Sequence, residues 1–90
     1  MSVYVDDYFT PYRGMKMCHM TADTLEELHA MAAKLGLSKW FQAKSSTPHY
    51  DLCAAKRREA IKLGAIPEGV MEGARRRLEA KQKAREQVRA

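Results

Sequence analysis

A well-marked helix between strand-like segments is the feature of this 90-residue chain that most constrains its fold. The spacing of Asp23 and Glu26 matches a capping box, in which side chains bind the free N–H groups of the first helical turn. Leucine and alanine then recur at helical spacing as far as Gly36, where glycine can adopt the left-handed conformation that ends a helix. We therefore predict a helix from Asp23 to Gly36.

Short runs of β-branched, aromatic or alternating residues predict three strands around this helix. The first covers residues 2–6, the second runs from Met15 to Met20, and the third covers residues 38–42. Proline and glycine predict a turn over residues 10–14, and a polar segment predicts a loop over residues 43–48.

Two further helices are predicted in the second half of the chain. One begins after Asp51, which we expect to be its N-cap, and runs to Leu63 with Gly64 as its stop. The last runs from about Glu68 to Val88 and has a narrow apolar stripe with few bulky side chains. We expect its final turns to project from the domain or to pair with a second copy in a homodimer.

The order of these elements predicts an α/β fold, with α+β as the alternative. We expect a small three-stranded sheet, two packed helices and a long basic carboxyl-terminal helix. Residues 1–66 would form the compact domain and residues 67–90 the basic helix. A right-handed crossover would make the second and third strands parallel. If the first strand is parallel as well, the polar residues after each strand meet at one carboxyl edge, where open α/β sheets bind ligands.

Histidine and aspartate side chains lie mostly at the ends of these predicted elements. His19 and His49 each precede a predicted helix, and imidazole can serve as a metal ligand or as a general acid or base. We assign them the catalytic role. Asp6 and Asp7 are adjacent carboxylates that follow a strand, and together with Asp51 they are the candidate metal ligands.

Each candidate also has a structural explanation. Asp23 and Asp51 are both suited to cap helices, and His29 is expected at the surface of the first helix. The chain contains no C-x-x-C, no H-E-x-x-H and no glycine-rich phosphate loop. A divalent metal is therefore one alternative, and the cofactor is left open.

Positive charge is concentrated in the second part of the chain. Residues 1–55 contain five basic and six acidic side chains, whereas residues 56–90 contain 11 basic side chains against five glutamates. Cations in the first turns of a helix oppose its dipole, so their presence favours an anionic ligand nearby. A solvated helix face with ion pairs is the alternative. We expect a phosphate-bearing ligand to be bound by Lys56, Arg57, Tyr50, Arg75, Arg76 and Arg77.

Composition also sets limits on location and class. No segment approaches the roughly 20 apolar residues of a membrane span, so we expect no membrane partner. Cys18 and Cys53 are expected to be reduced thiols of a cytoplasmic protein. A chain of this length forms one small domain.

Several segments together form a specific combination of motifs. They are Val3–Asp7, Cys18–Met20, Ala22–Asp23, Glu27–Ala32, Gly36–Leu37, Trp40–Gln42, His49–Leu52, Lys56–Arg57, Ala60 and Gly64–Ala65. Over residues 1–66 the chain resembles a small bacterial and bacteriophage family known only as a domain of unknown function, number four thousand and thirty-one. The resemblance implies a phage-type or bacterial cytoplasmic protein and no established activity. Its family pattern includes Asp6, Asp7, His19, Asp23, His29, His49, Asp51, Lys56 and Arg57.

We expect a small phage-type protein that binds a phosphate-bearing ligand, either a nucleotide or nucleic acid, with a metal ion as an optional participant. Whether it is an enzyme is left open. The alternative is a non-enzymatic phage effector that binds a host protein or host nucleic-acid machinery through its basic helix.

Overall fold

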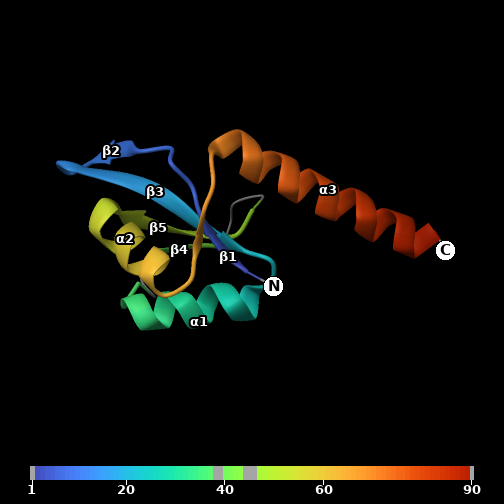
Figure 1. Ribbon diagram of the computed structural model, residues 1–90, viewed down its shortest axis with the longest axis horizontal. Coiled ribbons are helices and arrows are strands. Elements are labelled where there is room, and N and C mark those ends of the chain that lie inside the picture. The colour runs from blue at the N-terminus through green and yellow to red at the C-terminus, as the bar shows by residue number, and fades with distance from the viewer. Residues whose placement is uncertain (1, 38–39, 44–46, 90) are drawn as a thin grey trace.

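The computed structural model of the chain describes residues 2–37, 40–43 and 47–89. Within these residues it contains a mixed six-stranded sheet and three helices (Figure 1). The strands are β1 (Val3–Val5), β2 (Thr10–Tyr12), β3 (Met15–Ala22), β4 (Phe41–Gln42), β5 (His49–Cys53) and β6 (Ile66–Pro67). The helices are α1 (Leu25–Leu35), α2 (Ala54–Lys62) and α3 (Val70–Arg89).

The long strand β3 organises the sheet. The strand order is β4-β5-β3-β1-β6, and β2 pairs with the other end of β3 on the β1 side. Every pair is antiparallel except β1 with β6, which is parallel. One edge of the sheet is therefore made by β2 and β6.

The hydrophobic core lies between the sheet and helices α1 and α2, which cover the same face (Figure 1). Alternate residues of the central strands point into it, as period-2 strand geometry requires. Val5, Cys18, Met20 and Leu52 are fully buried there. Burial in this core, with the nearby Asp6 carboxylate, raises the pKa of Cys18 to about 12, so its thiol is neutral and belongs to the packing.

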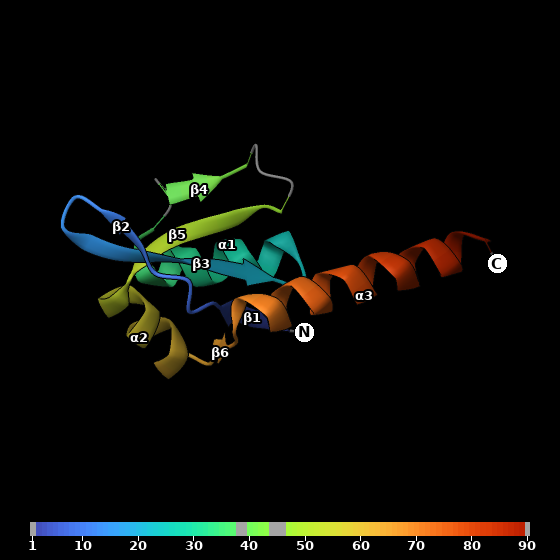
Figure 2. The same ribbon diagram turned by 90° about the horizontal axis from the view of Figure 1, so that it is seen from above.

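Helix α3 occupies a different position. It begins on the far side of the sheet from α1 and α2 and then extends past the end of the sheet (Figures 1 and 2). This extension accounts for the long dimension of the molecule, 48 Å against 25 and 24 Å. No helix in the described ranges is long and apolar enough to cross a membrane.

The predicted first helix is present, with a cap one residue later than expected. Thr24, and not Asp23, is the N-cap: its hydroxyl accepts a hydrogen bond from the Glu27 N–H at 3.2 Å. Gly36 ends the helix with φ 71°, and the Leu37 N–H binds the Ala32 carbonyl at 2.9 Å. This is a Schellman-type ending, with Gly36 in the left-handed conformation that the sequence predicts.

The prediction of a three-stranded sheet was wrong, because short strands were hidden in segments with turn or cap residues. The predicted loop ended at residue 48 and the predicted helix began after Asp51, yet His49–Cys53 forms strand β5. Helix α2 therefore starts at Ala54, and Asp51 does not cap it. Thr10–Tyr12 and Ile66–Pro67 also form strands. Of the predicted third strand, residues 38–39 lie outside the described residues and Phe41–Gln42 is a strand.

The prediction that the polar residues meet at one carboxyl edge of the sheet was also wrong. Strands β3 and β4 point in the same direction, as predicted, but β5 lies between them and runs antiparallel to both. Strand β1 is antiparallel to β3, so its carboxyl end meets the middle of β3. The polar residues consequently gather on a face of the sheet and not at its edge.

Candidate metal centre

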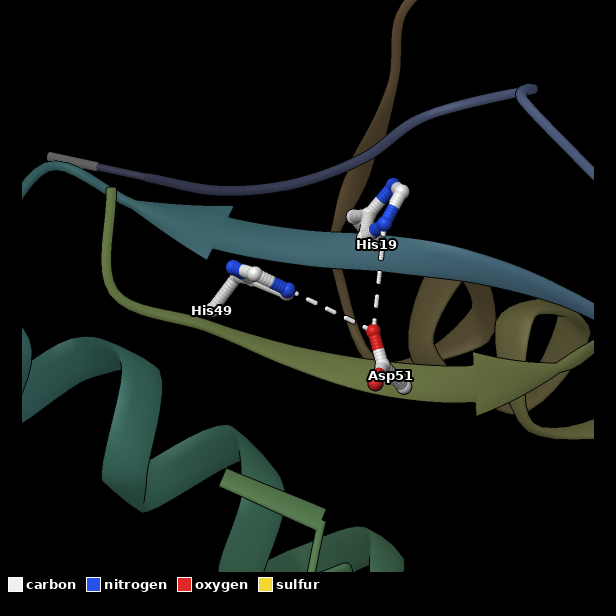
Figure 3. A group of neighbouring side chains, drawn as sticks. All are labelled: His19, His49 and Asp51. Carbon is white, nitrogen blue, oxygen red and sulfur yellow. Dashed lines mark ion pairs between the residues drawn. The ribbon is translucent and has the colours of Figure 1, made fainter. Parts of the chain in front are cut away.

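Three side chains converge on the sheet face opposite the core: His19 from β3, with His49 and Asp51 from β5 (Figure 3). The antiparallel register places His19 directly across from Asp51, and His49 lies two residues before Asp51 on the same face. The Asp51 Oδ1 atom is 3.8 Å from the His19 Nε2 and 3.4 Å from the His49 Nε2. One ligand atom from each residue lies within 4.8 Å of the others.

Hydrogen bonds fix which nitrogen of each imidazole is available. The His19 Nδ1 is 2.8 Å from the Asp6 carboxylate, and the His49 Nδ1 is 2.8 Å from the Thr47 carbonyl oxygen. A carboxylate and a carbonyl oxygen accept hydrogen bonds, so both Nδ1 atoms carry the proton in the neutral rings. Both Nε2 atoms then present a lone pair, as metal coordination requires.

Asp6 supports His19 from behind. Its carboxylate accepts the His19 backbone N–H at 2.9 Å as well as the ring N–H, and its own N–H donates to the His19 carbonyl at 3.0 Å. Arg57 adds a hydrogen bond from Nε to the Asp6 carbonyl at 2.8 Å. A carboxylate that holds the outer nitrogen of a ligating imidazole is the usual second partner of metal-bound histidine.

Two of the three distances among the ligand atoms suit a first-row transition metal, and the third is at most 4.8 Å. Zinc bonds of about 2.0–2.2 Å place neighbouring ligand atoms of a tetrahedral site about 3.3 Å apart. The two distances to the Asp51 oxygen are close to this value. Two imidazoles favour zinc, copper, iron or nickel over magnesium, calcium or manganese, which prefer oxygen ligands. Three protein ligands also leave coordination positions for water or substrate, as in catalytic sites.

Two hollows adjoin this group. A pocket of about 230 Å³ is lined by His19 and His49 on one side and by Gly69, Gly73 and Arg77 near the start of α3 on the other. A second pocket, of about 280 Å³, is lined by His19 and Asp51 together with residues of β2 and β4. His19 lines both pockets, whereas His49 lines the first and Asp51 the second.

Arg76 fixes the wall that α3 contributes to the first pocket. Its guanidinium donates to the Glu68 carboxylate at 2.8 and 3.2 Å and to the Thr21 hydroxyl at 3.1 Å. It also stacks on Tyr4, 3.5 Å from the ring centroid. Asp23 lies 3.8 Å from the same guanidinium and accepts the Ser2 N–H at 2.8 Å. Asp23 thus belongs to the anchor of α3 and not to the metal group.

The structure brings together some of the predicted site residues and separates others. His19, His49 and Asp51 form the group, with Asp6 behind His19. Asp7 is exposed and lies outside the group.

The predicted ligand-binding residues are dispersed. Tyr50 is 4% exposed on the core face, where its hydroxyl lies 2.7 Å from the His29 Nδ1. Lys56 pairs with Glu59 at 3.1 Å, and Arg57 packs over Phe9. Arg75 is exposed, Arg76 anchors α3, and Arg77 is the member of the predicted set that lines the first pocket.

Sequence reasoning missed the residues that complete this pocket, among them Thr47, Gly69 and Gly73. Thr47 contributes a backbone carbonyl, which leaves no signature in side-chain type. The two glycines reach the pocket only because α3 returns to the sheet, a long-range contact that the sequence pattern does not show.

A family model described as "Protein of unknown function (DUF4031)" matches residues 3–81. The match extends beyond the 66 residues on which the resemblance rested and includes Arg76 and Arg77 of α3. Comparisons with curated proteins and with solved structures found no match. Because the family model covers most of the chain, this protein belongs to the DUF4031 family.

Proposed function

We propose that this protein binds a divalent transition-metal ion through His19, His49 and Asp51, and that the ion binds a phosphate oxygen of a nucleotide or nucleic acid. The observation that carries the proposal is the convergence of two imidazole lone pairs on the Asp51 carboxylate. Each imidazole is held by a separate hydrogen-bond acceptor, so the arrangement is built before any ion binds.

The first pocket supports an anionic ligand next to the metal. Arg77 lines this pocket together with the two histidines. A guanidinium can bind two phosphate oxygens at once, and a metal ion can bind a third. The anion would therefore lie between the Arg77 guanidinium and the metal ion bound by His19, His49 and Asp51.

In this arrangement the histidines are metal ligands, which changes the catalytic role first assigned to them. An Nε2 lone pair that binds a metal is not available to accept a proton. The ion would polarise a phosphorus–oxygen bond or activate a bound water, and Asp6 and Thr47 would keep the rings oriented. Turnover is not required for the binding function that we propose.

The alternative is a non-enzymatic phage effector that binds a host protein or host nucleic-acid machinery through α3. That function would use α3 and not the sheet face, so it does not explain why His19, His49 and Asp51 converge there. We therefore favour the metal site.

The test is a calorimetric titration of metal-free protein with zinc. We expect one ion per chain, and a loss of affinity of at least 100-fold in His49→Ala and in Asp51→Ala, since each removes a direct ligand. His29→Ala is the matched control, because it removes a histidine that contacts Tyr50 outside the group. Equal zinc affinity in His49→Ala and His29→Ala would refute the site.

The phosphate part is tested separately with adenosine monophosphate. We expect this nucleotide to bind the zinc-loaded protein more tightly than the metal-free protein, and Arg77→Gln to weaken that binding without changing zinc affinity. Nucleotide binding that is independent of both zinc and Arg77 would contradict a phosphate bound in the first pocket.

A further inference from the structure

The charged side chains on one side of helix α3 are all basic. In a helix of 3.6 residues per turn, residues seven apart lie on one stripe and residues four apart lie on a slowly turning row. Glu72, Glu79 and Glu86 are seven apart and form the stripe. Arg77, Lys81 and Arg85 are four apart and lie on the opposite side of the helix. We call these three residues the cationic row.

The cationic row starts at the candidate metal centre. Arg77 lines the first pocket together with His19 and His49, and Lys81 and Arg85 follow on successive turns where their side chains are exposed. Helix α3 starts beside the sheet and extends past its end (Figure 2). The row therefore continues outward from the pocket as a track of positive charge.

The length of the row exceeds what one nucleotide can contact. Eight residues separate Arg77 from Arg85, which is about 12 Å along the helix axis at 1.5 Å per residue. In a B-form duplex each strand advances about 3.4 Å along the axis per phosphate, and the phosphates of an unstacked strand are further apart, so the row can reach about two to four consecutive phosphates. A mononucleotide placed at the metal could contact Arg77 but not Lys81 and Arg85 together.

We infer that the ligand is a nucleic-acid strand, with one phosphate at the metal and the neighbouring phosphates along the cationic row. This inference rests on the proposed metal and phosphate site, and it selects the polymer over the mononucleotide. No aromatic residue follows Tyr50 in the sequence, so the row lacks a platform on which bases could stack. The contacts along α3 would then be made to phosphates, so binding there would not depend on base sequence.

The experiment compares two double variants that remove the same charge from the same helix. Lys81→Gln with Arg85→Gln disrupts the cationic row. Arg75→Gln with Lys83→Gln is the control, since these two residues flank Glu79 at four-residue spacing on the acidic side. Binding of a labelled single-stranded DNA of about 12 nucleotides, long enough to cover the row, is measured on zinc-loaded protein over a range of salt.

We expect the slope of log affinity against log salt to fall by about 1.4 in the row variant, at about 0.7 per lost phosphate contact. The control variant should keep the wild-type slope. Adenosine monophosphate should compete with the DNA far less effectively, per nucleotide, than an unlabelled copy of the DNA. Equal slopes in the two variants, or equal competition per nucleotide, would overturn the inference. Tighter binding of the row to vesicles of anionic lipid than to DNA would also overturn it, in favour of a membrane surface.

A zinc titration of the row variant separates this inference from the proposed function. If zinc and adenosine monophosphate bind normally but DNA affinity does not depend on the row, the inference fails and the metal site stands. If DNA binding depends on the row but is unchanged in His49→Ala and without zinc, the placement of a phosphate at the metal fails, whereas the role of the row stands.

Discussion

Asp6 shows how a single carboxylate can set the chemistry of a neighbouring ring. Its two oxygens accept hydrogen bonds from the backbone N–H and from the ring N–H of His19. An asparagine has one oxygen and one NH2 group, so it can satisfy only one of these donors. If its NH2 faces the ring, the proton moves to Nε2, and the lone pair aimed at Asp51 is lost.

We therefore predict that Asp6→Asn lowers zinc affinity about 10- to 100-fold, the usual effect of changing the partner of a metal-bound histidine. Calorimetric titration measures this change, and circular dichroism checks that the fold is kept. Asp7→Asn is the adjacent control, because Asp7 is exposed and outside the metal group. The same loss of affinity in both variants would show that Asp6 acts only through general negative charge.

Helices α1 and α3 are held against the sheet in different ways: α1 by a buried hydrophobic face and α3 by polar contacts of Arg76. Leu28, Met31, Ala32 and Leu35 of α1 are buried, whereas Val70, Met71 and Leu78 of α3 are exposed. Arg76 compensates for this shortage with its contacts to Glu68, Thr21 and Tyr4. The Glu68 side chain is only 9% exposed, so it needs this cation.

We predict that Arg76→Met lowers the free energy of unfolding by about 1–3 kcal/mol, because a largely buried carboxylate loses its partner. Arg75→Met, at the neighbouring exposed position, should change it by less than about 0.5 kcal/mol. Urea denaturation of the two variants measures the difference. Similar unfolding midpoints would mean that α3 is not anchored through Arg76.

The same contrast explains which elements could be predicted from sequence. Helix α1 carries local signals near both ends, so its presence could be predicted, although its N-cap is Thr24 and not Asp23. In His49–Cys53, outward His49 and Asp51 alternate with inward Tyr50 and Leu52, a strand pattern that the suitability of Asp51 as a helix cap obscured. Strands of two residues, such as β6, are defined by their pairing with a neighbouring strand, and two residues are too few to show an alternating pattern in the sequence.

For the candidate site, residue types were predictable but their arrangement was not. His19, His49, Asp6 and Asp51 were selected as polar residues at element ends. That His19 faces Asp51, and that Asp6 faces His19, depends on the antiparallel registers of β3 with β5 and of β1 with β3. Those registers arise from pairing between distant segments, which a single sequence does not specify.

For the molecule as a whole, the contacts of α3 divide it into an anchored and a projecting part. The predicted domain boundary after residue 66 lies before Glu68 and Arg76, whose contacts connect α3 to the sheet. Beyond Leu78 the described side chains are exposed up to residue 87. The last turns therefore contribute little apolar burial to stability.

We predict that deleting residues 79–90 changes the free energy of unfolding by less than about 0.5 kcal/mol and leaves zinc affinity unchanged. Deleting residues 75–90 also removes Arg76, and this deletion should lower the free energy of unfolding by about 1–3 kcal/mol, as Arg76→Met does. Thermal unfolding followed by circular dichroism compares the two truncations. A large loss of stability in the shorter deletion would indicate that the final turns pack, in a dimer.

The edge of the sheet formed by β2 and β6 has a consequence for behaviour at high concentration. Each of these strands contains a proline, Pro11 in β2 and Pro67 in β6, and proline has no N–H to donate to an incoming strand. A neighbouring molecule approaching this edge meets gaps in the row of hydrogen-bond donors, so the sheet is poorly suited to grow from one molecule into the next. Proline at these two places thus protects the protein against amyloid-like assembly along that edge.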